Sequence, residues 1–224
     1  MNKFDLAELI GILLGDGCIG VYKTRAENKI KIQHRVKITL DSNVDSEYAE
    51  YVKTLLDSIL NVTSLIRKRK GENTLDVLTF RQHAFDFLVT SVGLKISPKK
   101  YRAAIPSEFQ EGVYGLRVLR GYCDTDGSLV ITNNNGTVYP RIEMKVCPSP
   151  MLAQFVDILT AAGFRFGVYN VINEEVRIQI NGLKQVMKWK QLVGFSNLKQ
   201  VRKYQEILQT YKNKLATAST MASK

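Results

Sequence analysis

A strict alternation of polar and apolar residues runs through residues 29–40. This period of two is typical of a β-strand with one face in the core and the other face exposed. Cations occupy most of the exposed-face positions, and because like charges along one strand face repel each other, the pattern favours an anionic partner. The polar positions are Lys29, Lys31, Gln33, Arg35, Lys37 and Thr39, and the apolar ones are Ile30, Ile32, His34, Val36, Ile38 and Leu40.

The same order of elements is predicted twice along the chain. In each half a hydrophobic helix is followed by a strand pair, a second helix, a second strand pair and a closing helix, which is the α+β pattern α-β-β-α-β-β-α. Asp5 is the predicted cap of the first helix, and Ser42 with Asp45 opens the second in a capping-box pattern. Predicted helices include residues 6–16, 84–91, 183–192 and 198–215, together with the helix that Ser42 and Asp45 open and that runs to about Leu60. Predicted hairpin turns lie at residues 71–73, 133–136 and 173–175.

This repetition predicts the domain organisation. Residues 1–105 are expected to form the first half and residues 116–215 the second, with residues 106–115 as the linker. Residues 216–224 lack any periodicity and are expected to be a disordered tail.

Two nine-residue stretches, residues 9–17 and 119–127, share a pattern of small residues. Gly11 and Gly15 in the first stretch correspond to Gly121 and Thr125 in the second. Residues four apart lie on one helix face, and a glycine inside a helix costs roughly 0.5–1 kcal/mol relative to alanine. The recurrence therefore predicts that the two helices pack closely through these small faces.

Each stretch also ends in Asp-Gly, at Asp16 and Asp126. A carboxylate near a helix C-terminus is disfavoured by about 0.3–1 kcal/mol, and parallel packing of the helices would bring the two carboxylates together. A divalent cation such as Mg²⁺, which prefers oxygen ligands, would remove this repulsion. The alternative is that each Asp-Gly is an ordinary helix-ending turn.

These stretches resemble the motif of the LAGLIDADG homing endonucleases, in their single-chain form with two motifs. Gly11, Gly15, Asp16 and Gly17, then Gly121, Asp124, Asp126 and Gly127, match its glycine and acidic positions, whereas Leu14 departs from it. The resemblance implies a monomer in which two four-stranded saddles bind the major groove of duplex DNA. It also implies an asymmetric target and metal-dependent hydrolysis of both strands that leaves 3′ overhangs.

The resemblance further assigns roles at the cut. Asp16 and Asp126 are the expected metal ligands, with the backbone carbonyls of Gly15 and Thr125, and Mg²⁺ is the expected ion, with Mn²⁺ or Ca²⁺ able to occupy the same sites. Many members carry a glutamine where this chain has Leu40 and Val146, so the water-positioning network differs here. The expected basic residues at the cut are Lys95 or Lys99 in the first half and Lys199 in the second, with Lys37 and Lys145 as rivals.

Composition agrees with a nucleic-acid partner. The 224 residues carry a net charge of +11 with 45% hydrophobic residues, so the chain has enough apolar residues for a core and a surplus charge that favours a polyanion. The expected DNA contacts lie on the polar strand faces and hairpins: Lys23, Arg25, Lys29, Lys31, Gln33, Arg35, Lys37, Arg67, Lys68, Arg69, Lys70, Thr79, Arg81, Asn134, Tyr139, Arg141, Glu143, Lys145, Asn170, Arg177, Gln179 and Asn181.

Other features limit the remaining choices. The chain shows neither a secretory signal nor an apolar run of the ~20 residues that a membrane span needs, so an intracellular location is expected, in a prokaryotic cytoplasm or nucleoid or inside an organelle. The three cysteines lack zinc-site spacing. Three alternative functions stay open: an intron RNA maturase of the same fold, a catalytically silent DNA-binding protein, and a basic protein whose aspartates are structural.

Overall fold

The computed structural model describes residues 2–26, 29–134, 137–171 and 174–222. It is an α+β protein with the two halves that the sequence predicts. The first half consists of α1 (Lys3–Leu14), β1 (Gly17–Ala26), β2 (Lys29–Asp41), α2 (Ser46–Leu60), β3 (Leu65–Lys68), β4 (Thr74–Thr79), α3 (Gln82–Asp86) and the π-helical turn η1 (Phe87–Ser91).

A connection that contains the short 3₁₀ helix η2 (Ser107–Phe109) leads into the second half. This half consists of α4 (Gly112–Thr125), β5 (Gly127–Asn134), β6 (Thr137–Val146), α5 (Pro150–Ala161), β7 (Gly167–Asn170), β8 (Val176–Asn181), α6 (Leu183–Leu192) and α7 (Leu198–Ala222). The second half therefore repeats the first and adds one long helix, α7.

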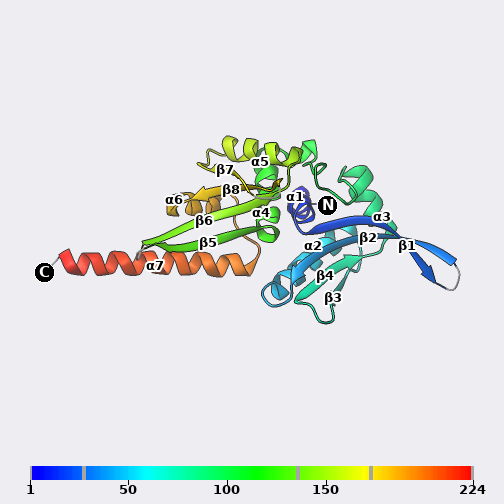
Figure 1. Cartoon of the computed structure of the whole chain (residues 1–224), viewed down its shortest axis with the longest axis horizontal. Helices are drawn as coiled ribbons and strands as arrows, with labels where there is room; N and C mark the ends of the chain where they lie inside the picture. Colours follow the sequence, from blue (N-terminus) through cyan, green and yellow to red (C-terminus); the bar gives the residue numbers. More distant parts are fainter. Residues whose placement is uncertain (1, 27–28, 135–136, 172–173, 223–224) are drawn as a thin grey trace.

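Each half contains one antiparallel four-stranded sheet, in the orders β1-β2-β4-β3 and β5-β6-β8-β7. Helices α1 and α4 lie between the two sheets at the centre of the molecule (Figure 1). The strand residues that alternate with the polar positions, such as Val36, Ile38, Ile142 and Met144, are fully buried. The apolar faces of both sheets thus form the core, and the polar faces remain open for a partner.

Helices α1 and α4 pack with almost no side chain between them. A Cβ on Gly11 would overlap the carbonyl oxygen of Val118 and lie 2.9 Å from the backbone nitrogen of Tyr122. A Cβ on Gly121 would overlap the carbonyl oxygen of Glu8 and lie 2.9 Å from the nitrogen of Ile12. The predicted close packing through the small residues is therefore present, and the two contacts repeat each other across a pseudo-twofold axis.

Glu8 breaks that symmetry. Its side chain is buried in α1, where one carboxylate oxygen accepts from Arg120 Nε of α4 at 3.0 Å and the other accepts from Tyr51 Oη of α2 at 2.8 Å and from Ser196 Oγ at 2.5 Å. A buried charge is tolerated only when it is paired and hydrogen-bonded. Glu8 therefore joins three helices and the loop before α7 across the boundary between the halves.

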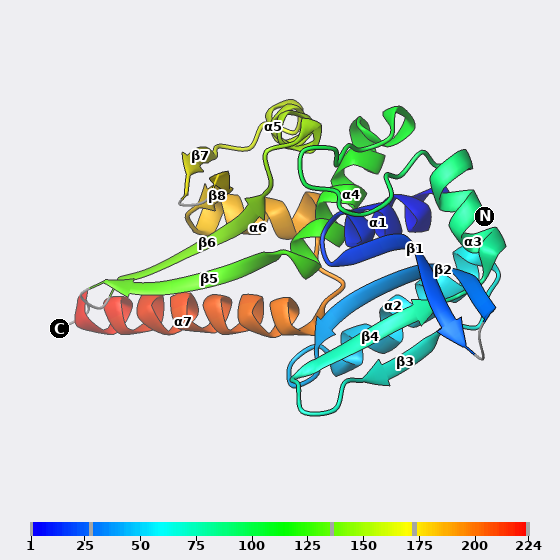
Figure 2. The same ribbon diagram turned by 45° about the vertical axis from the view of Figure 1, so that its right-hand side comes forward.

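The two long hairpins are covered unequally. Helix α7 runs beside β5 and β6 (Figure 2), and Tyr211 Oη of α7 donates to the carbonyl oxygen of Val138 at 2.6 Å. The β1-β2 hairpin instead projects away from the core (Figure 1), and its Ile30 and Ile32 are 70% and 59% exposed. The prediction that the whole apolar face of β2 is core is therefore wrong for its first residues, because the hairpin is longer than the helical layer behind it.

Several predicted boundaries also differ from the structure. Asn2 rather than Asp5 caps α1, accepting from the nitrogen of Phe4 at 3.0 Å, and α1 ends at Leu14 because Gly15 leaves the helical conformation. Helix α4 begins at Gly112, inside the predicted linker. The helical backbone of α7 continues to Ala222 instead of fraying after residue 215, since that segment holds no proline or glycine to stop it.

Candidate active site and nucleic-acid interface

Asp16 and Asp126 follow the ends of the two central helices. Each stands between the last helical turn and the first strand of its half, and the carbonyl oxygen of Asp16 accepts from the nitrogen of Thr39 at 3.1 Å. A Cβ on Gly15 would lie 3.5 Å from an Asp126 carboxylate oxygen. Asp126 therefore lies against the residue that precedes Asp16, so the helix packing brings the two acidic positions together.

The two carboxylates are electrostatically strained. Burial, and then the charge of Asp126, raises the pKa of Asp16 to about 7. Asp126 is the more exposed residue of the two. Desolvation of its carboxyl nevertheless raises the pKa of Asp126, and the positive charge of Lys99 opposes this shift. Two neighbouring carboxyls with raised pKa values are stabilised in their ionised form by a bound cation.

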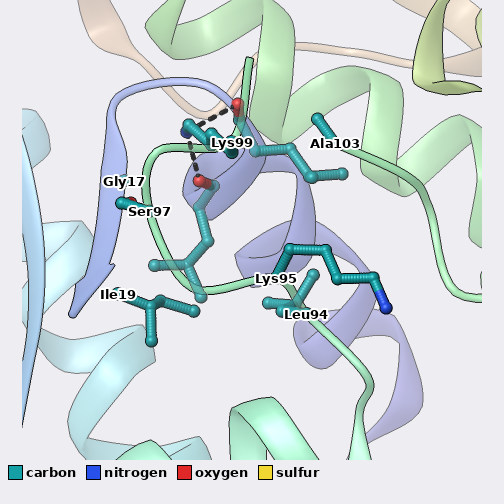
Figure 3. A pocket seen from close by; sticks show the side chains of 9 residues that line it. Gly17, Ile19, Leu94, Lys95, Ser97, Lys99 and Ala103 are labelled. Carbon is teal, nitrogen blue, oxygen red and sulfur yellow. Dashed lines mark hydrogen bonds between the residues drawn. The ribbon is translucent and has the colours of Figure 1, made fainter. Parts of the chain in front are cut away.

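Lys99 lies at the C-terminal end of α1. Its ammonium donates to the carbonyl oxygens of Leu13 and Leu14, both at 2.7 Å (Figure 3). It also donates to the carbonyl oxygen of Gly15. Burial lowers the pKa of Lys99 to about 8, although the charges of Asp126 and Asp16 oppose this shift. Lys99 thus neutralises the negative helix end and sits beside both carboxylates.

The other two predicted basic residues are placed differently. The Lys95 side chain is exposed and points away from Lys99 (Figure 3), so it does not join Lys99 at the end of α1. The reason is that the neighbouring Leu94 is buried, which turns Lys95 outward. Lys199 lies in the first turn of α7, and its ammonium forms an ion pair with the Asp45 carboxylate at 2.8 Å.

The donor set fits a hard divalent cation that also needs oxygens from a substrate. Within the described ranges no cluster of three or more His, Cys, Asp or Glu side chains could hold a metal ion, so the protein offers the carboxylates of Asp16 and Asp126 as a pair. Such ions are commonly held by one or two carboxylates plus phosphates. The carbonyl of Gly15, a predicted ligand, already accepts from Lys99.

Asp124, the other acidic residue of the second motif, has a structural role. It is fully buried, and one carboxylate oxygen accepts from the backbone nitrogens of Ser196 at 2.6 Å and Asn197 at 3.1 Å, where α7 begins. Burial raises its pKa to about 7. The first half has Leu14, also buried, at this place and no equivalent of α7 to anchor, which explains the departure from the motif.

The strand register decides which predicted contacts share the first polar face. Lys31, Gln33, Arg35 and Lys37 pair with Thr24, Tyr22, Gly20 and Cys18, and all eight lie on that face. The Arg35 guanidinium stacks on the Tyr22 ring, 3.7 Å from its centroid. Lys23 and Arg25 pair instead with Ile32 and Ile30, so they lie on the opposite face of the hairpin, contrary to the prediction.

The second hairpin of the first half corrects other predicted contacts. Arg69 forms a bidentate pair with Asp76, with both donor-to-oxygen distances at 2.9 Å, and Arg67 pairs with Asp76 in the strand register on the same face. Thr79 pairs with Val36 on the apolar face and is buried, so it is not a DNA contact in this structure. Lys68 pairs with Leu75 on that apolar face too, whereas Lys70 and Arg81 are exposed in loops.

The second sheet presents most of its predicted residues together. Arg141, Glu143 and Lys145 of β6 pair with Asn181, Gln179 and Arg177 of β8, and Tyr139 shares their face. Glu143 accepts from Arg141 and, at 2.8 Å, from Gln179 Nε2, so it orients two neighbouring donors. Asn170 pairs with the buried Val176, and its neighbour Tyr169 takes the polar face instead. The side chains of Lys29 and Asn134 lie outside the described part of the chain.

Comparison with known proteins finds one family model and several solved structures that this chain resembles. Residues 7–110 match the model of the LAGLIDADG DNA endonuclease family. Among solved structures, mesophilic variants of the homing endonuclease I-DmoI align with a TM-score of 0.60 at 16% identity, over 86% of this chain and 96% of that one. The meganuclease I-SmaMI bound to uncleavable DNA aligns with a TM-score of 0.64 at 10% identity, over 93% and 90%.

The resemblance found in the sequence is therefore confirmed. Residues 7–110 match this family's model, and the whole chain has the fold of the homing endonuclease I-DmoI and the meganuclease I-SmaMI. No curated protein is a significant match. In the described ranges no helix combines the length and apolar character needed to cross a membrane.

Proposed function

We propose that this protein is a divalent-metal-dependent homing endonuclease that cuts both strands of a long asymmetric DNA target and leaves 3′ overhangs. The observation that carries the proposal is the pair of desolvated carboxylates, Asp16 and Asp126, at the ends of α1 and α4 between two polar sheet faces. I-DmoI has been crystallised with DNA and Mn, and with DNA and Ca, which supports a divalent ion without choosing among Mg²⁺, Mn²⁺ and Ca²⁺.

Each group in the site has a separate task in this proposal. Asp16 and Asp126 would hold the ion, which when bound lowers the pKa of a water molecule and stabilises charge on the reacting phosphate oxygens. Lys99 places a buried cation beside the same position and so attracts the scissile phosphate. The two polar faces hold the duplex in register, with arginines and amides available for base edges in the major groove.

An asymmetric target follows from the differences between the halves. On the first face Asp76 binds Arg69, and Lys31, Arg35 and Lys37 make the rest mainly cationic. On the second face Glu143 fixes one arginine and one glutamine. A single chain with unlike halves has no need of a palindromic site, and we propose that it acts as a monomer on duplex DNA.

The decisive experiment is selection from a randomised duplex library incubated with the full chain and Mg²⁺, followed by sequencing of the cut ends. The expected result is one long, non-palindromic consensus with staggered 3′ overhangs. A chain that left every duplex intact while it bound structured RNA in the same buffer would contradict the proposal and favour a maturase.

Salt dependence tests which face meets the DNA. The logarithm of the binding constant falls by about 0.9 per neutralised phosphate for each unit of log salt, so a slope of about −3 or steeper is expected. Lys31→Gln should make this slope shallower by about 1. Lys23→Gln removes the same charge from the opposite face of the same hairpin and should change it much less. Equal effects of the two variants, measured by titration at several salt concentrations, would contradict this orientation.

A further inference from the structure

Lys99 and Lys199, whose charges act on Asp16, are held in unlike ways. Lys99 donates to three backbone carbonyl oxygens at the end of α1, and none of the ion pairs in the described residues includes it. Lys199 instead forms an ion pair with the Asp45 carboxylate at 2.8 Å. The charges of Asp45 and Lys199 both act on Asp16, so this pair lies close enough to the central carboxylates to influence them.

Asp45 occupies the N-cap position of α2 but does not cap it. Its side chain makes no hydrogen bond to the helix, although aspartate at an N-cap ordinarily accepts from a backbone nitrogen two or three residues on. The carboxylate accepts instead from Asn197 Nδ2 at 2.9 Å, and Asn197 Nδ2 also donates to the carbonyl oxygen of Asp124 at 3.1 Å. Asp45 is thus turned from its own helix toward the other half.

This arrangement fixes Asp45 firmly. Asp45 is 6% exposed and Asn197 is 1% exposed. The carboxylate that pairs with the Lys199 ammonium is therefore buried, and the hydrogen bond from Asn197 already orients it. A lysine side chain has a flexible stem of about four carbons. An ion pair with a fixed, buried carboxylate limits the positions that its ammonium can take. Ser149 holds the N-cap position of α5, which is the equivalent of Asp45 in the second half, and it cannot supply a charge to Lys99.

We propose that Asp45 is a positioning residue that aims Lys199 at one of the two cut sites, so that the two strands are cleaved by sites with unlike basic residues. This inference rests on the proposed function. It assigns to Asp45 an effect on one strand only, because in this proposal Lys99 serves the other strand and is held by the carbonyl oxygens of α1 rather than by an ion pair. A merely structural Asp45 would affect both strands alike.

The test uses the target selected above, with a different fluorophore at the 5′ end of each strand, so that each strand's cleavage rate is measured in one reaction. Lys199→Met should slow one strand, and Asp45→Asn should slow the same strand by about 10-fold or more, as is found when a residue that orients a metal ligand is removed. The double variant should be no slower than Lys199→Met alone, because both changes act through one ammonium. Lys99→Met should slow the other strand preferentially.

Asp57→Asn is the matched control. Asp57 also pairs with a lysine, Lys53, at 2.6 Å, but it lies in the last turn of α2, about 18 Å along the helix from Asp45. It should leave both strand rates unchanged. Equal slowing of both strands by Asp45→Asn, or slowing beyond that of Lys199→Met in the double variant, would overturn the positioning role.

A second readout separates this inference from the proposed function. The melting temperatures of the wild type, the two single variants and the double variant should show coupling between Asp45 and Lys199, since the ion pair exists with or without DNA. Additive changes in melting temperature would overturn the pair itself. Coupling in a protein that cuts no duplex would instead overturn the proposed function and, with it, the role in cleavage.

Discussion

Replacing Asp16 or Asp126 by asparagine is expected to abolish DNA cleavage in a protein that still folds and binds its target. Either change removes one of the two charged oxygen donors at the site. An ion at such a site supplies several kcal/mol of charge stabilisation, and about 1.4 kcal/mol corresponds to tenfold in rate, so cleavage should fall by about 10³-fold or more. DNA affinity without metal should hold or rise, because a negative charge near the phosphates is gone.

The same variants should gain stability in a pH-dependent way. The pKa of Asp16 is about 7 in the folded chain against its ordinary value of 3.8, so the folded state binds more protons between these values and loses stability as pH rises through this window. Asparagine does not titrate. Without metal, the advantage of Asp16→Asn should therefore be absent near pH 4 and reach about 1–3 kcal/mol above pH 7.

Thermal melts from pH 4 to pH 8.5, binding titrations and cleavage assays on the same preparations check both expectations. Adding Mg²⁺ should raise the melting temperature of the wild type more than that of Asp16→Asn. If either asparagine variant still cut DNA in Mg²⁺, or if it melted lower than the wild type at pH 8, that aspartate would be a turn residue rather than a ligand.

Adding a single methyl group at the helix interface is expected to be the most destabilising small change in the chain. In an exposed helix, glycine to alanine stabilises by up to about 1 kcal/mol. At Gly121 the new Cβ would overlap the carbonyl oxygen of Glu8, and backbone atoms cannot rotate away as a flexible side chain can. Gly121→Ala should therefore lose about 3 kcal/mol or more, with Gly11→Ala similar.

Urea unfolding of the two variants measures this loss. Thr125→Ser is the matched control, since it removes a methyl group from the same interface while the hydroxyl that donates to the carbonyl of Gly121 is kept, and it should cost about 1 kcal/mol or less. Stability equal to or above that of the wild type for Gly121→Ala would mean that α1 and α4 are not in backbone contact.

The repeated pattern of the sequence predicts the fold because it depends on local periodicity and on matched glycines. Face assignments failed where they depend on how two strands are aligned. Lys23 and Arg25 were predicted to contact DNA because β1 is basic. They pair with Ile32 and Ile30, so they lie on the face opposite to Lys31 and Arg35. A shift of one residue in pairing reverses a side chain's face, and the sequence of one strand does not fix that register.

Tertiary contacts account for the other differences. Lys95 and Lys99 lie in one loop, and only the path of that loop decides which ammonium reaches the carbonyls of α1. Asp45 has the sequence signature of a helix start, yet its carboxylate binds Asn197 and Lys199, which lie more than a hundred residues away. Local preference predicted the place of the helix correctly but could not reveal the distant partner of its capping residue.

The Glu8 contacts have a consequence for how the halves can be recombined. The two motifs are 110 residues apart, from Asp16 to Asp126. By this spacing Val118 is the equivalent of Glu8 in the second half, and Ile10 is the equivalent of Arg120 in the first half. Two copies of the first half would bury two Glu8 carboxylates that keep the hydrogen bond from Tyr51 but meet isoleucine in place of Arg120. A buried charge without an ionic partner costs several kcal/mol. The first half therefore cannot serve as its own partner, and a chimera that keeps it must take a second half that carries an arginine at the position of Arg120.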